Sequence, residues 1–281
     1  MHCNDMAVMP EMVAGLPPMA AAQAEAAPRR LRYVCSGAQQ PVLRLFWFHH
    51  AGGSGASFRS MQALMPADWQ IVWVEYAGHG ENAGVPAACE MAQLQADLWH
   101  SLAHLLDRPY ALFGHSMGAL AAFGFARNAQ ATGARMPCWL GASGRFAPHV
   151  ASALGYYLHK LSDAALAESI AALGASALEL LAGEDERRAW LDLMRADLQV
   201  CETWQPALLP RLDCALTAFI GRDDPMIKVA QMQSWQVLCN GDFELQSFDG
   251  GHFYLVARKR ELAAQIVEKV SQYRDAGHET I

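Results

Sequence analysis

The sequence predicts an α/β fold with a mostly parallel central sheet, because short apolar runs alternate with segments of helical periodicity. Two of these runs, Leu43–His49 and Gln70–Tyr76, are dominated by bulky apolar side chains, as strands buried on both faces are. Between Glu90 and Asp107, apolar residues recur every three or four positions, which predicts a helix with one face on the core. Strands that alternate with helices in this way form βαβ units, with helices on both faces of the sheet.

Length and composition limit the class of protein. The chain has 281 residues, which allows one large α/β domain. Hydrophobic residues make up 53% of the chain and charged residues 17%, so we expect a substantial core or an apolar cleft. The net charge of −7 and the lack of a Lys/Arg run argue against nucleic acid or a membrane surface as a partner. Seven scattered cysteines without a C-x-x-C pair indicate free thiols in a reducing compartment, so we expect a cytoplasmic protein.

The first 28 residues differ in composition from the rest. They are rich in Ala, Met and Pro, and we expect a disordered tail there. Asp5 and Glu11 stand where a secretory signal peptide is basic, so we expect no cleavable signal. No stretch of the sequence is long and apolar enough to span a bilayer. A single domain is therefore expected over residues 29–281.

A small-residue loop, Ala51–Ser57, follows the first apolar run. Small residues let the backbone approach a ligand closely, and we expect Ser57 to cap a helix that starts near Phe58. No Lys-Ser/Thr pair follows the glycines, which disfavours a phosphate-binding loop. His49 and His50 precede this loop, but no third ligand stands at metal spacing, so a structural role is favoured over a metal site.

The pentad GHSMG at residues 114–118 lies between an apolar run and a helical pattern. Strand, G-x-S-x-G and helix in this order are the context of a nucleophile elbow, in which the serine occupies the tip of a sharp turn. The two glycines are needed because a Cβ atom there would collide where strand and helix pass closely. We therefore expect Ser116 to be a nucleophile, with the N–H of Met117 facing the same space at the helix N-terminus.

The strand pattern stops between Pro148 and Pro210, after a short apolar run at Cys138–Ala142. Four segments in this interval have helical patterns: His149–Tyr157, Asp163–Leu173, Ala175–Leu181 and Glu184–Thr203. Because the insertion follows the elbow side of the sheet, we expect a helical lid over the strand ends at about residues 148–210. A helical satellite that only pads the core is the alternative.

Two later strands end in residues that complement a serine. Ala215–Ile220 is followed by Asp223 and Asp224, and Asp242–Phe248 is followed by a glycine pair and His252. A serine hydroxyl needs a base, and the base needs a carboxylate that fixes its tautomer. We expect His252 to be the base and Asp224 its partner, since Asp224 directly precedes a proline that would hold the turn; Asp223 is the alternative. The chain order serine, aspartate, histidine is that of the α/β-hydrolase fold. A final amphipathic helix is expected after this loop, at Glu261–Tyr273.

These residues support acyl transfer through a serine acyl-enzyme, with water as the expected acceptor. The tetrahedral intermediate of such a reaction needs backbone donors for its oxyanion. The N–H of Met117 is one expected donor. The N–H of Ala51, in the loop after the first strand, is the other.

Five short motifs carry a family likeness: His50–Ser54, Gly114–Ala119, Ser143–Arg145, Met194–Leu198 and Gly250–Phe253. Through them, from about Leu43 to Val270, the chain resembles the stand-alone type II thioesterases that accompany non-ribosomal peptide and polyketide synthases. The resemblance implies an α/β-hydrolase fold with a mobile helical lid. It also implies hydrolysis of wrong or stalled acyl groups from the phosphopantetheine arm of carrier proteins. Ser116, Asp224 and His252 match the catalytic positions of that family, and no cofactor or metal is implied.

The sequence departs from the family pattern at two places. His49 stands where the family usually has a proline, and the loop Tyr76–Asn82 lacks the two arginines that are common there. These changes concern contacts with substrate or partner rather than the hydrolytic core. The alternatives are a product-releasing or fatty acyl thioesterase, a small-ester hydrolase, an acyltransferase, or a protein that only docks on a carrier. The expected partners are acyl or peptidyl carrier domains of a synthase, and the expected state is a monomer.

Overall fold

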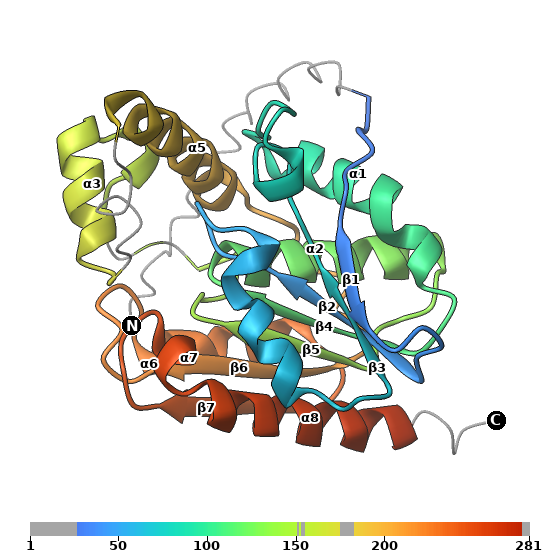
Figure 1. Cartoon of the computed structure of the whole chain (residues 1–281). Helices are drawn as coiled ribbons and strands as arrows, with labels where there is room; N and C mark the ends of the chain where they lie inside the picture. Colours follow the sequence, from blue (N-terminus) through green and yellow to red (C-terminus); the bar gives the residue numbers. More distant parts are fainter. Residues whose placement is uncertain (1–26, 151, 153–154, 175–182, 277–281) are drawn as a thin grey trace, which may run out of the picture.

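A seven-stranded sheet forms the centre of the molecule (Figure 1). The computed structural model describes residues 27–150, 152, 155–174 and 183–276. The strand order is β1-β3-β2-β4-β5-β6-β7, with β1 antiparallel to β3 and the other neighbouring pairs parallel. The strands are β1 (Val34–Gly37), β2 (Leu43–Phe48), β3 (Trp69–Trp73), β4 (Tyr110–His115), β5 (Trp139–Ser143), β6 (Ala215–Gly221) and β7 (Phe243–Phe248). The predicted mostly parallel sheet is confirmed.

Helices cover both faces of this sheet, as predicted. The helices α1 (Met91–Leu102) and α2 (Met117–Thr132) pack on one face, and the 3-10 helix η1 (Gly55–Leu64) and α8 (Lys259–Ala276) pack on the other (Figure 1). Phe46 and Trp47, adjacent on β2, belong to the two different cores, because successive side chains of a strand point to opposite faces. This is why the strand reads as an unbroken apolar run. The shorter helices are η2 (Gly80–Asn82), η3 (Ala103–Leu105), α6 (Val229–Met232), η5 (Gln233–Leu238) and α7 (Tyr254–Ala257).

Two expectations about helices are wrong. Ser54, rather than Ser57, caps η1 by accepting from the N–H of Ala56, while the side chain of Ser57 accepts from the N–H of Ser54 at 3.0 Å. The two serines form a capping box, so the helix begins earlier than the apolar pattern indicates. The described residues between 149 and 157 form turns and bends and no helix.

The helical insertion contains η4 (Leu158–Lys160), α3 (Asp163–Ala171) and α5 (Glu184–Thr203). The predicted helix at Glu184–Thr203 is confirmed at both ends, while the predicted segment Ala175–Leu181 lies outside the described residues. These helices share a small apolar core of their own, and α3 and α5 lie together at the upper left of Figure 1. That core contains Leu158, Leu166, Ile170, Leu191, Met194 and Leu198.

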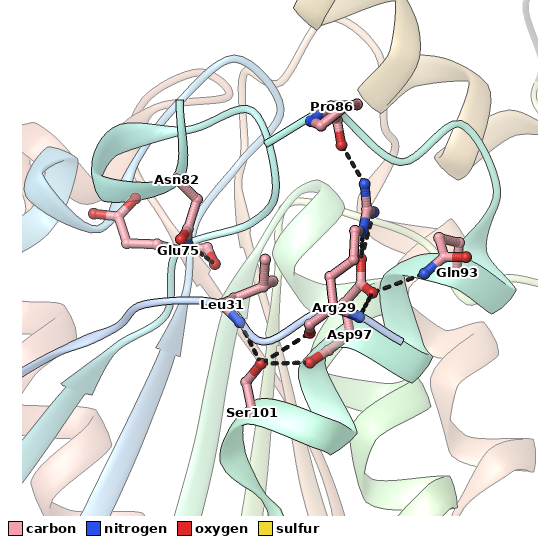
Figure 2. A network of polar contacts seen from close by, with 8 residues as sticks. All are labelled: Arg29, Leu31, Glu75, Asn82, Pro86, Gln93, Asp97 and Ser101. Carbon is pink, nitrogen blue, oxygen red and sulfur yellow. Dashed lines mark hydrogen bonds and ion pairs between the residues drawn. The ribbon is translucent and has the colours of Figure 1, made fainter. Parts of the chain in front are cut away.

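The chain before β1 is fastened to α1 by a polar network (Figure 2). Arg29 donates to the buried carboxylate of Asp97 through its backbone N–H at 2.7 Å and through Nε at 2.9 Å. The N–H of Leu31 donates to Ser101 Oγ at 2.7 Å, one helical turn further along α1. Residues 1–26 of the expected tail lie outside the described residues. Within the described ranges, none of the helices has both the length and the hydropathy that crossing a bilayer requires.

Candidate active site

Ser116 lies in a strained turn between β4 and α2. Its φ of 56° and ψ of −117° place it in a region that non-glycine residues rarely adopt, and the structure describes no other non-glycine residue with positive φ. The N–H of Ser116 donates to Ser143 O at 2.7 Å, which ties the turn to β5. A Cβ atom on Gly114 would lie 2.0 Å from Gly118 O, and one on Gly118 would lie 2.2 Å from Phe48 O. Both glycines are therefore required by close packing, as the sequence predicts.

Asp224 and His252 meet after two neighbouring strands. Asp224 follows β6 and His252 follows β7, and the Oδ2 of Asp224 lies 2.7 Å from Nδ1 of His252. Both residues are buried, with 3% and 4% of their surface exposed. The other carboxylate oxygen, Oδ1, accepts from the N–H groups of Met226 at 2.9 Å and Ile227 at 3.2 Å. These backbone donors hold the carboxylate, and its contact with Nδ1 orients the imidazole.

Asp223, the alternative acid, occupies a different position. Its side chain is exposed, and its backbone N–H donates to Gly250 O at 3.0 Å. It therefore braces the glycine pair before His252 through its backbone, while its carboxylate faces solvent.

A small cavity joins Ser116 to His252. Its volume is about 60 Å³, enough for about four to six water-sized groups. Ala51 borders it from the loop after β2, and Arg145 and Glu202 are the charged residues at its wall. The apolar wall comes largely from the helical insertion: Leu158, Ile170, Leu173, Met194 and Leu198. The serine therefore faces a space that the insertion covers.

The two residues expected to supply oxyanion donors both lie near this serine. Met117 is the first residue of α2, directly after Ser116, and Ala51 borders the cavity. The loop that contains Ala51 is attached to α5, because the N–H of Gly52 donates to Asp197 Oδ2 at 2.7 Å. The N–H of Gly53 donates back to His50 O at 3.1 Å. The backbone around Ala51 is thus fixed by the contacts of its neighbours.

Two histidines, His115 and His50, lie beside the site. No sequence pattern identifies them as part of it. His115 Nδ1 lies 2.9 Å from Ser143 Oγ, which lies 2.8 Å from the hydroxyl of Tyr254. Burial, with smaller effects of His252 and His50, lowers the pKa of His115 well below its usual value. Burial, aided by His252 and His79, lowers the pKa of His50 to about 3. Both rings are therefore neutral at pH 7. Their position in the pentad and beside the first strand was the only signal available in the sequence.

The loop Tyr76–Asn82 contains a buried ion pair with α5. His79 Nε2 lies 3.1 Å from Asp197 Oδ1, and both residues are 2% exposed. Burial acts to lower the pKa of His79, but the charge of Asp197 and hydrogen bonds to Asp197 and Gly53 outweigh it, so this pKa is raised. In the described part of the chain, no three His, Cys, Asp or Glu side chains are grouped so as to hold a metal ion.

Comparison with known proteins gives a consistent result. The sequence model of the family described as "Thioesterase domain" matches residues 43–272. Linear gramicidin dehydrogenase LgrE of Brevibacillus parabrevis is 33% identical over 232 residues, 82% of this chain and 88% of that protein. The probable cadicidin biosynthesis thioesterase of Streptomyces griseus is 30% identical over 239 residues, 85% of this chain and 65% of that protein. The solved structure of RedJ, a thioesterase from the prodiginine biosynthetic pathway in Streptomyces coelicolor, superposes with a TM-score of 0.75 at 33% identity, over 86% of this chain and 92% of that chain.

Proposed function

This chain belongs to the thioesterase domain family, and from that premise we propose that Ser116, His252 and Asp224 are its catalytic residues. The protein has the α/β-hydrolase fold and is an enzyme that hydrolyses thioesters. The observation that carries the residue assignment is the 2.7 Å contact of His252 with Asp224, at the cavity that His252 shares with Ser116. The strained turn at Ser116 supports it further, because such strain is characteristic of functional sites.

The reaction follows from the roles of these groups. His252 Nε2 takes the proton of Ser116 Oγ as that oxygen attacks the thioester carbonyl, and Asp224 stabilises the imidazolium that forms. The oxyanion accepts hydrogen bonds from the N–H groups of Met117 and Ala51. Collapse of the intermediate breaks the carbon–sulfur bond, and the departing thiolate takes the proton from His252. Water then gives a proton to His252 and attacks the acyl-enzyme, which releases the free acid and returns the proton to Ser116.

We propose that the thioester is presented on the phosphopantetheine arm of an acyl or peptidyl carrier domain. Hydrolysis of wrong or stalled acyl groups would then regenerate a non-ribosomal peptide or polyketide synthase. This is supported by relatives whose names link them to cadicidin and prodiginine biosynthesis. In this proposal the enzyme is a monomer whose partners are carrier domains.

The helices η4, α3 and α5 are proposed to act as the lid of this site. Each of them contributes an apolar side chain to the cavity at the serine: Leu158 from η4, Ile170 from α3 and Leu198 from α5. An apolar cover of this kind excludes water from the acyl chain. The lid in this proposal extends over about residues 148–210.

Acyl-carrier hydrolysis tests the proposal. Purified protein is mixed with carrier protein loaded with acyl groups of several lengths, and the free acid and the deacylated carrier are measured by mass spectrometry. We expect turnover in the wild type and a loss on the order of 10³-fold or more in Ser116→Ala, by analogy with other serine hydrolases. Ser60→Ala, at an exposed position of η1, is the control. Intact thioesters with the wild type would refute the proposal, and a new ester or amide would identify an acyltransferase instead.

A further inference from the structure

Residues on one face of α5 form hydrogen bonds with both the N–H and the carbonyl group of Gly52, in the loop beside the serine. Trp190 Nε1 donates to Gly52 O at 3.3 Å, and Asp197 Oδ2 accepts from Gly52 N–H at 2.7 Å. Met194 lies between them, and a Cβ atom on Gly52 would be 2.4 Å from its Cε. Residues 190, 194 and 197 are spaced by four and three, so they share one face of the helix. Gly52 also has a φ of 68°, so another residue there would be strained as well as crowded.

The second oxygen of Asp197 pairs with a histidine whose charge follows from its partners. His79 Nε2 lies 3.1 Å from Asp197 Oδ1, and His79 Nδ1 lies 2.7 Å from Gly53 O. A carbonyl oxygen and an ionised carboxylate both only accept hydrogen bonds, so both ring nitrogens of His79 carry a proton. His79 is therefore an imidazolium, and it contacts Asp197 and the same loop at once.

Four other ionisable groups contact His79 or act on it electrostatically. They are Glu75, Tyr76, His49 and His50. Burial, with His79 itself, lowers the pKa of His49 well below its usual value, and burial raises the pKa of Tyr76 well above its usual value. Burial also raises the pKa of Glu75. Asp197 and, to a smaller extent, Glu75 both act to raise the pKa of His79, and Asp197 is the carboxylate within hydrogen-bond distance of its ring.

We propose that Asp197, His79 and Trp190 are positioning residues, which hold the Ala51–Gly52 backbone so that the Ala51 N–H is directed at the oxyanion. The inference rests on the proposed acyl-enzyme mechanism. It makes α5 more than a cover, because the helix that lines the acyl cavity also sets the geometry of an oxyanion donor. The neutral pair further keeps an uncompensated carboxylate away from the developing negative charge.

Substitutions along α5 test this proposal. Asp197→Asn and His79→Gln are compared with Asp192→Asn, which alters an exposed carboxylate of the same helix. We expect kcat for acyl-carrier hydrolysis to fall about 10- to 100-fold in the first two, the range that a small misplacement of catalytic groups produces. KM should change by less than about threefold, because substrate contacts are kept, and Asp192→Asn should match the wild type. A folded Asp197→Asn protein with wild-type kcat would overturn the proposal.

A milder variant covers the case in which Asp197→Asn does not fold. Trp190→Phe removes only the donor to Gly52 O and keeps the aromatic packing. We expect a loss in kcat of about 3- to 10-fold, in line with one weakened positioning contact. Unchanged kcat in this variant would contradict the proposal.

The pH profile separates charge from packing. In the wild type, kcat should decline at alkaline pH as His79 loses its proton and Asp197 is left uncompensated. His79→Arg keeps a cation at every accessible pH, so the decline should move to higher pH. An identical alkaline decline in both proteins would count against the charge role.

The rate at which a fluorophosphonate labels Ser116 distinguishes a failure here from a failure of the proposed function. The adduct is tetrahedral and needs the same oxyanion donors, but no carrier. If the wild type is labelled but leaves carrier thioesters intact, the carrier proposal fails and the labelling rates of the variants still decide the role of Asp197.

Discussion

Gly221 at the end of β6 packs directly on Gly251 in the loop after β7: a Cβ atom on Gly221 would lie 2.2 Å from Gly251 O. The backbones of the two loops that carry Asp224 and His252 are therefore in direct contact, with no room for a side chain between them. This close approach is what allows the 2.7 Å contact between the carboxylate and the imidazole.

Gly221→Ala should push these loops apart. We expect kcat to fall on the order of 100-fold, because the carboxylate would no longer hold the imidazole in place. Gly84→Ala is the matched control, since a Cβ atom there meets nothing within 4 Å. Steady-state kinetics on an acyl-carrier substrate measure both, and equal kcat values for the two variants would show that the close packing is not needed.

Asp224→Asn should abolish most activity, whereas Asp223→Asn should not. An amide in place of the carboxylate favours the wrong tautomer of the base and loses the stabilisation of the imidazolium, which costs about 10⁴-fold in kcat in a comparable triad. The exposed Asp223 acts through its backbone, so we expect its variant to stay within about twofold of the wild type. The reverse order of the two kcat values would assign the acid to Asp223.

Acid should destabilise the fold through buried histidines. Burial lowers the pKa of His49, His50 and His115, in His50 to about 3. A lowered folded-state pKa gives stability that is complete above the unfolded value near 6.5 and is lost as the pH falls below it. Each neutral histidine contributes up to about 1.4 kcal/mol per pH unit to that loss. His79, whose pKa is raised, acts in the opposite sense, since its contribution is complete below 6.5 and is lost at higher pH.

Urea unfolding at pH 7.5, 6 and 5 measures this dependence, because these pH values lie above and below the ordinary histidine pKa of about 6.5. In His50→Phe, which keeps an aromatic ring beside Phe58 and Phe253, the decline in unfolding free energy should be shallower by about 1 kcal/mol per pH unit. The exposed His100→Gln is the control. Parallel curves for all three proteins would exclude the buried His50 as a source of acid lability.

Arg29→Ala should weaken the attachment of the N-terminal segment to α1 (Figure 2). Asp97 is fully buried and would lose its cation, which should lower the free energy of unfolding by about 2–3 kcal/mol. Arg30→Ala, an exposed neighbour, should change it by less than about 0.5 kcal/mol. Denaturant titrations compare the two, and equal stabilities would mean that the Asp97 carboxylate is satisfied without Arg29.

Much of the fold could be predicted because its signals are local. The unbroken apolar run of β2 reflects burial on both faces, and the pentad around Ser116 specifies its own turn. The antiparallel edge strand β1 has no such run, because its residues alternate between partly buried and exposed. The start of η1 was missed because Ser54 and Ser57 both suit a cap, and only the hydrogen bonds distinguish them.

In the candidate site, too, some residues could be predicted from local sequence and others could not. Chain order and strand ends suffice to propose Ser116 and His252. The choice between Asp223 and Asp224 depends on which side chain is buried, and that is decided by how two distant loops pack. The His79–Asp197 pair joins residues 118 positions apart, and neither residue has a local pattern that predicts the other.

The sheet order has a practical consequence for dissecting this enzyme. The proposed nucleophile follows β4, whereas the proposed acid and base follow β6 and β7, so every peptide break between β5 and β6 divides these three residues between two polypeptides. Each fragment alone would be inactive. Fusing the halves to interacting proteins would turn recovered thioester cleavage into a reporter of their reassembly.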